Sequence, residues 1–232
     1  MKLECILFDL DDVLFDASLQ TSNARLSAMR AMIEAGLPSD IETGYRLLEE
    51  IVGKYGPDYE KHFDVLLERL GLRWNPRVIA AGVVAYREAS LAYLRPYPDT
   101  IPTLLRLREA GMELGITSEG RLVKQWQKLI QLGLQHLFHD VVVCEELGSK
   151  SFEPRVFKEA VSRFGTSPER TLFVGKRLNP DIASANEAGL VTARVRRGTL
   201  RGEEPKLSRE KPSFEIARIS DLLTVIDIKS AR

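Results

Sequence analysis

The chain of 232 residues has little of what marks extracellular, membrane-bound or nucleic-acid-binding proteins. It has only two cysteines, Cys5 and Cys144, and no Cys-x-x-Cys spacing. We therefore expect buried thiols, not a disulfide or a metal site, and a cytoplasmic location. Lys plus Arg and Asp plus Glu number 33 each. This balance gives no overall field that favours nucleic acid or a membrane as a partner.

Long apolar runs are also missing. The longest fall far short of the roughly 20 residues that cross a membrane as a helix. Met1 and Lys2 lead directly into a predicted strand, so we expect no signal peptide. The length and the hydrophobic content of 44% instead indicate a soluble globular protein of one or two domains with a full core.

After residue 96 the sequence alternates between helix and strand patterns. Four predicted helices each end next to a glycine, and an apolar run typical of a strand follows each of them. The helices span 98–110, 121–132, 154–164 and 179–188, and the strands span 112–117, 141–144, 171–174 and 191–195. This order is typical of βα units. We therefore predict an α/β fold with a doubly wound, mainly parallel, Rossmann-like sheet that includes a first strand near residues 6–8.

Residues 17–94 have a different pattern, because apolar residues recur there at helical spacing and no convincing strand pattern occurs. The predicted helices span 17–35, 40–52, from Pro57 to Gly71, and from Asn75-Pro76 to Leu94. We interpret their apolar stripes as helix-packing seams. The chain thus predicts two domains: an α/β core formed by 1–15 and 96–232, and an inserted all-helical domain formed by 16–95.

Two carboxylates directly follow the first strand. In ILFDLDDVLFD, residues 6–16, Asp9 and Asp11 stand two positions apart, so their side chains leave the strand on the same face. Open α/β sheets bind their ligands at this edge. Two such carboxylates repel each other unless a cation or a shared proton lies between them. The pair therefore indicates a functional site in preference to an acidic loop.

Polar residues also follow the next three strands. Thr117 and Ser118 can present hydroxyl and N–H groups to an anion, although both residue types also cap helices. Lys150 lies in the loop after VVVC, and Gly175 and Asp181 frame the start of the next helix. A carboxylate at a helix start is favourable without any ligand. Each signal is weak alone, but four of them at adjacent strand ends indicate one site.

The order and spacing of these motifs resemble the haloacid dehalogenase (HAD) superfamily of hydrolases, in its phosphatase-like branch with a helical cap, over about residues 3–225. By this resemblance Asp9 is the nucleophile that takes the phosphoryl group as an aspartyl phosphate, and Asp11 is the general acid and base. Thr117 and the backbone N–H groups of Leu10 and Ser118 would bind the transferring phosphoryl group. A carboxylate nucleophile suits neutral pH, because it needs no deprotonation.

The resemblance also implies a magnesium cofactor. Its ligands would be Asp9, the backbone carbonyl of Leu10 or Asp11, and Asp181 directly or through water. In the family pattern Gly-Asp-x-x-x-x-Asp, however, Lys176 takes the first aspartate position, normally a magnesium ligand. Magnesium prefers oxygen ligands, so we place Lys176 among the substrate-binding candidates.

The third family motif, Gly-x-x-Lys-Pro-x-Pro-x-x-Phe, is also changed. Gly148, Pro154 and Phe157 fix its register, which puts Ser151 in the lysine position and Lys150 one residue early. A lysine side chain on a displaced loop can still reach a site. We therefore carry Lys150 over as a catalytic candidate and Ser151 as a substrate-binding candidate.

Three functions stay open from the sequence. The favoured one is a magnesium-dependent phosphomonoester hydrolase that acts on a small phosphorylated metabolite through an aspartyl-phosphate intermediate, as a monomer or homodimer. The second is a metal-impaired relative, a weak phosphatase or a non-catalytic phosphate-binding protein, in which Lys176 replaces the metal charge. A 2-haloacid dehalogenase is disfavoured, because a halide leaving group needs no acid and Asp11 is retained. A fourth idea, a response-regulator receiver domain, is disfavoured, because the chain contains an inserted helical domain.

A basic stretch runs from Arg194 to Lys211 and contains few glutamates. Such a stretch can bind anions or nucleic acid. We interpret it as a solvated loop.

Overall fold

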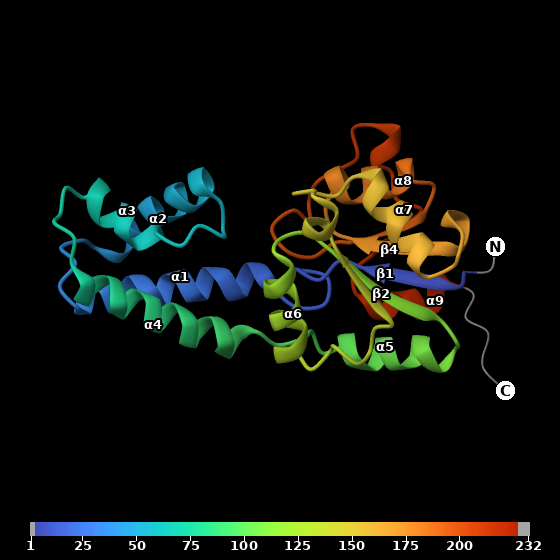
Figure 1. Cartoon of the computed structure of the whole chain (residues 1–232), viewed down its shortest axis with the longest axis horizontal. Coiled ribbons are helices and arrows are strands. Elements are labelled where there is room, and N and C mark those ends of the chain that lie inside the picture. The colour runs from blue at the N-terminus through green and yellow to red at the C-terminus, as the bar shows by residue number, and fades with distance from the viewer. Residues whose placement is uncertain (1–2, 227–232) are drawn as a thin grey trace. The chain divides into compact units, whose positions relative to one another are not determined.

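The computed structural model describes residues 3–226. The chain divides into two units, one formed by Met1–Ser18 with Leu94–Arg232 and one formed by Leu19–Tyr93 (Figure 1). These divisions lie near the boundaries expected at residues 15–16 and 95–96. The first unit contains the sheet, and the second is helical.

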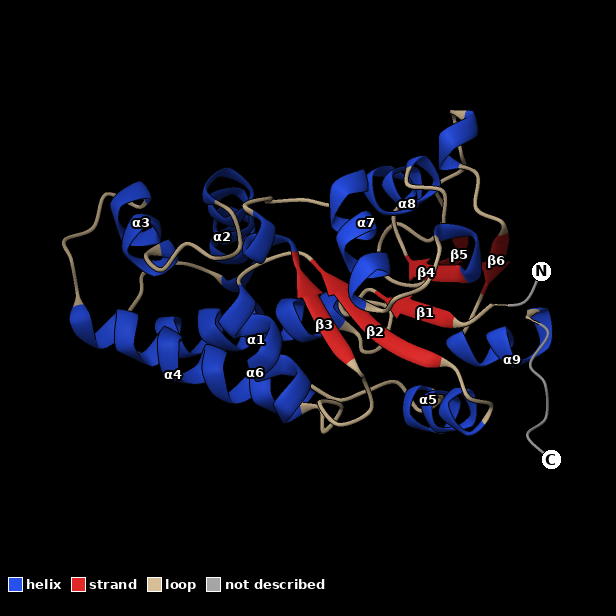
Figure 2. Ribbon diagram, turned by 45° about the vertical axis from the view of Figure 1, so that its right-hand side comes forward, coloured by secondary structure: helices blue, strands red, loops and turns tan. Residues whose placement is uncertain are grey.

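A six-stranded sheet with the order β3-β2-β1-β4-β5-β6 forms the centre of the first unit, and each pair of neighbouring strands is parallel (Figure 2). The strands are β1 (Cys5–Phe8), β2 (Glu113–Ser118), β3 (Asp140–Val143), β4 (Thr171–Gly175), β5 (Val191–Val195) and β6 (Phe214–Ile216). The chain order reverses at β1, which has β2 on one side and β4 on the other. In open α/β sheets, ligands bind outside the carboxyl ends of the strands at such a reversal.

Helices cover both faces of the sheet, as the alternating side chains of β1 require. Ile6 and Phe8 belong to the apolar core that includes residues of α5 (Thr100–Glu109), α6 (Leu122–Gln131) and α9 (Leu222–Val225). Cys5 and Leu7 belong to the core that includes residues of α7 (Pro154–Arg163) and α8 (Ala183–Glu187). The predicted doubly wound α/β fold is therefore confirmed. Both cysteines are free and buried, as predicted.

The helical unit has its own core. Its helices are α1 (Ala17–Glu34), α2 (Ile41–Tyr55), α3 (His62–Arg69) and α4 (Pro76–Tyr93), and each contributes buried apolar residues to one cluster. Two glycines allow close packing, because a Cβ atom on Gly44 would lie 2.5 Å from Met29 Sδ and one on Gly82 would lie 2.7 Å from Met32 Cγ. The predicted all-helical insertion is confirmed. Within residues 3–226, no helix has the length and apolar character needed to cross a membrane.

Two secondary-structure predictions were wrong in detail. The third helix of the insertion begins at His62 and not after Pro57. The preceding segment forms a turn, in which the His62 ring contacts the Gly56 carbonyl at 2.9 Å and the Tyr59 ring stacks on Tyr55. The strand β6 was missed, because three residues are too few to show a strand pattern.

The interpretation of the basic stretch as a solvated loop was wrong for its first residue. Arg194 lies in β5 and is fully buried. Its guanidinium group donates hydrogen bonds to the backbone carbonyls of Lys176, Leu200 and Glu203. Through these hydrogen bonds, Arg194 connects the segments after β4 and β5 to the sheet.

Candidate active site

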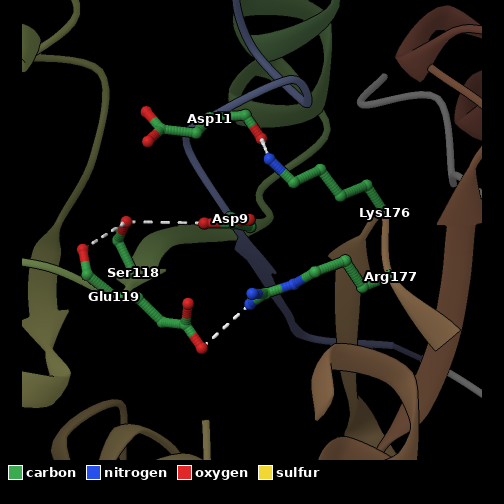
Figure 3. A pocket seen from close by; sticks show the side chains of 6 residues that line it. All are labelled: Asp9, Asp11, Ser118, Glu119, Lys176 and Arg177. Atoms are coloured by element: carbon green, nitrogen blue, oxygen red, sulfur yellow. Dashed lines mark hydrogen bonds and ion pairs between the residues drawn. The ribbon is translucent and has the colours of Figure 1, made fainter. Parts of the chain in front are cut away.

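Residues from three neighbouring strand ends line one pocket at the carboxyl edge of the sheet (Figure 3). The cavity has a volume of about 200 Å³, and its lining residues are Asp9, Asp11, Ser118, Glu119, Lys176 and Arg177. They come from the ends of β1, β2 and β4, which are adjacent in the sheet. Parallel strands thus bring together side chains that are far apart in the sequence.

Asp9 is a buried carboxylate, with only 4% of its surface exposed. Its Oδ1 atom accepts hydrogen bonds from the backbone N–H of Leu10 at 2.8 Å and from Ser118 Oγ at 3.4 Å. Burial, and next the negative charge of Asp181, raise the pKa of Asp9 to about 8, although the charge of Lys176 opposes this. At this pKa the Asp9 side chain mostly holds its proton at neutral pH, so, contrary to the expectation from the sequence, it must lose a proton before it can act as a nucleophile. Strongly shifted pKa values are common for catalytic groups.

Thr117 precedes Ser118 in β2 and is fully buried. Its hydroxyl has no hydrogen-bond partner among the residues that the structure describes. An unpaired buried hydroxyl costs about 1–3 kcal/mol. Thr117 therefore has a free hydrogen-bond donor next in sequence to Ser118, although Thr117 itself does not line the cavity.

The Asp11 carboxylate binds Lys128 of α6, whose Nζ lies 2.7 and 2.8 Å from its two oxygens. Figure 3 shows this carboxylate pointing away from the side chain of Asp9. Lys128 is far in sequence from the motif residues, and no sequence motif around it predicts this contact. The structure thus holds the second predicted catalytic carboxylate in an ion pair.

Asp12 was not singled out from the sequence, but it fixes the turn after β1. Its φ of 58° lies in the left-handed region, which aspartate tolerates better than most residues. Its carboxylate accepts hydrogen bonds from Ser18 N at 2.7 Å and Lys176 Nζ at 2.9 Å. Burial alone would raise the pKa of Asp12, but Lys176 and Ser18 outweigh it and lower that pKa.

Lys176 extends into the loop after β1. Its Nζ donates hydrogen bonds of 2.9 Å to the backbone carbonyl of Asp11 and to Asp12 Oδ2. Burial would lower the pKa of Lys176, but the charges of Asp9 and Asp12 outweigh it and raise that pKa. The side chain therefore carries a positive charge in the pocket, although only 15% of it is exposed.

Arg177 connects two acidic residues across the pocket. Its Nε atom donates to Asp181 Oδ1 at 2.6 Å, and its guanidinium group lies 2.9 Å from Glu119 Oε1. Burial alone would lower the pKa of Arg177, but the negative charges of Asp181 and Glu119 have the larger effect and raise it. Asp181 is fully buried and packs tightly on Gly175, where an added Cβ atom would lie 3.0 Å from Asp181 Cβ.

The loop after β3 supports this ion pair and supplies no cation to the cavity lining. Ser151 Oγ donates to Glu119 Oε1 at 2.7 Å, and Phe152 N donates to the same oxygen at 3.0 Å. Lys150 is exposed and does not belong to the residues that line the cavity. Ser151, which takes the register position of the family lysine, thus contacts a cavity-lining residue but does not line the cavity itself. Arg177 and Glu119 adjoin the motif residues Lys176 and Ser118, and this adjacency was the only sequence signal for them.

The implied magnesium ion does not fit these residues as they are arranged. Its implied ligands are oxygens of Asp9, of the Leu10 or Asp11 carbonyl and of Asp181, but Lys176 Nζ occupies the Asp11 carbonyl and Arg177 binds Asp181. A divalent ion about 4 Å from the ammonium would be repelled by on the order of 8 kcal/mol at an effective dielectric of 20. Between residues 3 and 226, no cluster of three or more His, Cys, Asp or Glu is suited to a metal ion.

Comparisons with known proteins show the family and the fold. The family model described as haloacid dehalogenase-like hydrolase matches residues 3–189. A glyceraldehyde 3-phosphate phosphatase from Methanopyrus kandleri is 49% identical over 226 residues, which are 97% of each chain. A HAD phosphatase structure from Thermococcus onnurineus superposes with a TM-score of 0.68 at 23% identity, over 99% of this chain and 100% of that chain. YfnB from Bacillus subtilis, in a structure bound to magnesium, has a TM-score of 0.69 at 22% identity, over 98% and 100%.

Proposed function

Because this chain belongs to the haloacid dehalogenase-like hydrolases, we propose that it is a phosphomonoester hydrolase whose nucleophile is Asp9. The family predicted from the motifs is confirmed, and its phosphatase-like branch with it. The observation that carries the mechanism is the buried Asp9 carboxylate, which shares a small pocket with Lys176 and Arg177. That pocket combines a nucleophile with the positive charge that a phosphoryl group needs.

We propose glyceraldehyde 3-phosphate, or a phosphate ester of similar size, as the substrate. The support is the relative of that name, which is 49% identical and is matched over 97% of its length. The cavity of about 200 Å³ suits a phosphoryl group with few further atoms. A 2-haloacid dehalogenase is not favoured, because the dehalogenases among the structural neighbours are 20–23% identical and share only the fold.

The reaction proceeds by two displacements at phosphorus. After Asp9 has lost its proton to solvent, one of its oxygens attacks the phosphorus, the bond from phosphorus to the ester oxygen breaks, and a protonated Asp11 gives its proton to the departing alkoxide. Water then attacks the phosphorus of the aspartyl phosphate while Asp11 takes a proton from it. Inorganic phosphate leaves, and the Asp9 carboxylate is restored. Covalent catalysis thus replaces one difficult step by two easier ones.

The other side chains bind and orient. Lys176 lines the cavity and supplies positive charge. By the family resemblance, Thr117, which adjoins the cavity-lining Ser118, would donate its free hydroxyl to a phosphoryl oxygen. To act as the acid, Asp11 must leave its ion pair with Lys128, take up a proton and turn towards the leaving oxygen. Lys150 has no role in this mechanism, because it does not line the cavity. No step is assigned to magnesium, since the arrangement of Lys176 and Arg177 does not fit it.

We also propose a cytoplasmic location, which the two free cysteines support, because thiols persist in reducing compartments. The monomeric or homodimeric state stays a prediction.

Phosphate release by the purified protein tests the proposed function. We expect release from glyceraldehyde 3-phosphate and from p-nitrophenyl phosphate, and no halide release from 2-chloropropionate. Asp9→Asn is the control, because it keeps the size of the side chain and removes the nucleophile. Equal phosphate release by wild type and Asp9→Asn would overturn the proposal, and so would halide release that depends on Asp9.

A further inference from the structure

We propose that Lys176 takes the place of the magnesium ion, so that the site binds the phosphoryl group of its substrate without a divalent metal. This inference rests on the proposed function, because it concerns how the same pocket holds the same substrate. The contact that carries it is that of Lys176 Nζ, which lies 2.9 Å from the backbone carbonyl of Asp11, one of the two carbonyls, of Leu10 or Asp11, that the family resemblance offers to the metal.

The position of Lys176 is built into the surrounding structure. Its N–H donates to Asp181 Oδ2 at 3.2 Å, and its carbonyl accepts from Nε of the fully buried Arg194 at 3.1 Å. At the other end, Asp12 holds the ammonium and is itself held by Ser18. Both ends of the lysine are therefore fixed before a substrate arrives. Such preorganisation makes a charged group effective in a binding site.

The ammonium also has a donor left for a ligand. Lysine has three N–H donors, and the hydrogen bonds to Asp11 O and Asp12 use two of them. Since Lys176 lines the same cavity as Asp9, the third donor is available to a phosphoryl oxygen beside the nucleophile. A charge-assisted hydrogen bond of this kind is roughly twice as strong as a neutral one.

The other expected metal ligand is also neutralised. Arg177 binds the buried Asp181 at 2.6 Å, so this carboxylate no longer needs a metal ion to balance its charge. Lys176 and Arg177 are consecutive in sequence and both line the cavity. Together they supply two positive charges, the number that Mg²⁺ would bring. The loop after β4 thus carries a cationic replacement for the ion.

Magnesium binding gives the first test. Calorimetric titration of magnesium chloride should show no binding to the wild type at millimolar concentrations. Lys176→Asp should bind magnesium, because it returns an oxygen ligand and changes the local charge by two units. Lys206→Asp is the matched control, since Lys206 is exposed and lies outside both this pocket and its supports. Magnesium should raise the melting temperature of Lys176→Asp alone. Tight magnesium binding by the wild type overturns the inference.

Phosphate binding gives the second test, and it does not depend on turnover. In a chelating buffer, inorganic phosphate should bind to the wild type and should bind at least about tenfold more weakly to Lys176→Met. Melting curves establish that Lys176→Met is folded, and Lys176→Asp serves if it is not. Phosphate binding by the wild type that requires magnesium overturns the inference, and so does equal binding by folded Lys176→Met.

Turnover separates the two proposals. We expect wild-type hydrolysis of glyceraldehyde 3-phosphate at the same rate, within about twofold, in magnesium and in chelator. Hydrolysis that chelator abolishes and magnesium restores overturns the role of Lys176 and leaves the proposed function standing. Absent hydrolysis in both buffers, with metal-free phosphate binding that needs Lys176, contradicts the proposed function and supports the inference.

Discussion

The loops after β1 and β4 follow neighbouring strands but bring opposite charges to the pocket. The β1 loop supplies carboxylates, of which Asp9 is buried and Asp11 is paired with Lys128. The β4 loop supplies Lys176 and Arg177, both charged and mostly buried. The first loop keeps the family pattern and the second departs from it. This difference is what we expect if, as we propose, Asp9 keeps the nucleophilic role while Lys176 supplies the positive charge of the metal.

The largest expected effect tests the chemistry of the β1 loop. Acid quench during turnover should trap a phosphoryl group on Asp9, detectable by mass spectrometry of the peptide that contains it. Asp9→Asn should show no trapped phosphoryl group and should lose on the order of 10⁴-fold or more in kcat, because a covalent nucleophile is removed. A phosphoryl group trapped on another residue would contradict the assignment, and wild type quenched without substrate is the control.

The next effect tests the charge balance of the β4 loop. Arg177→Met should lower the free energy of unfolding by about 3–5 kcal/mol, because it leaves the fully buried Asp181 without its charged partner. The matched control is Arg196→Met, which removes the solvent-accessible ion pairs with Glu204 and Glu215 and should cost at most about 1 kcal/mol. Urea unfolding of both variants measures the difference. Adding Asp181→Asn to Arg177→Met should recover part of the loss, and equal costs for the two single variants would contradict this account.

Sequence reasoning worked where the information is local. The strand-end pair Asp9 and Asp11, and the position of Thr117, follow from the apolar runs before them. The motif register put Ser151 in the family lysine position, although Lys150 was kept as the catalytic candidate. In the structure Ser151 donates to the cavity-lining Glu119, and Lys150 is exposed. Local patterns of this kind also predicted the order of helices and strands.

The ion pairs of the site could not be predicted from the sequence, because they join residues that are distant in it. Lys128 meets Asp11 only when α6 packs beside the end of β1, and Glu119 meets Arg177 only when β2 and β4 flank β1. The left-handed turn at Asp12, which holds Lys176, shows no signal beyond the residue type. The direction of a long charged side chain depends on such packing. The departure at Lys176 was visible in the sequence, but its contact with the Asp11 carbonyl was not.

A smaller effect separates two residues within the β1 loop. Asp11→Asn should reduce kcat by about a hundredfold with glyceraldehyde 3-phosphate and by less than about tenfold with p-nitrophenyl phosphate. An acid helps most when the departing oxygen is basic, and p-nitrophenolate leaves without a proton. Initial rates with both substrates check this. Equal losses with the two substrates would remove Asp11 from the acid step.

The last expected effect concerns stability and not catalysis: it is the stability cost of keeping Asp9 in its site. Its pKa is raised from 3.8 to about 8, mainly by burial and next by Asp181, so the folded protein holds this proton more tightly than the unfolded chain does. The stability that Asp9 contributes is therefore complete below pH 3.8 and is lost as the pH rises through 8. Asp9→Asn has no proton to lose. Its melting temperature relative to the wild type should thus increase between pH 5 and pH 9, by about 2–4 °C for each kcal/mol gained. Paired melting curves at these two pH values measure the change. A constant difference between the two proteins would show that the Asp9 carboxylate is not perturbed, and a difference that grows with pH would show that the β1 loop retains its nucleophile at the expense of stability.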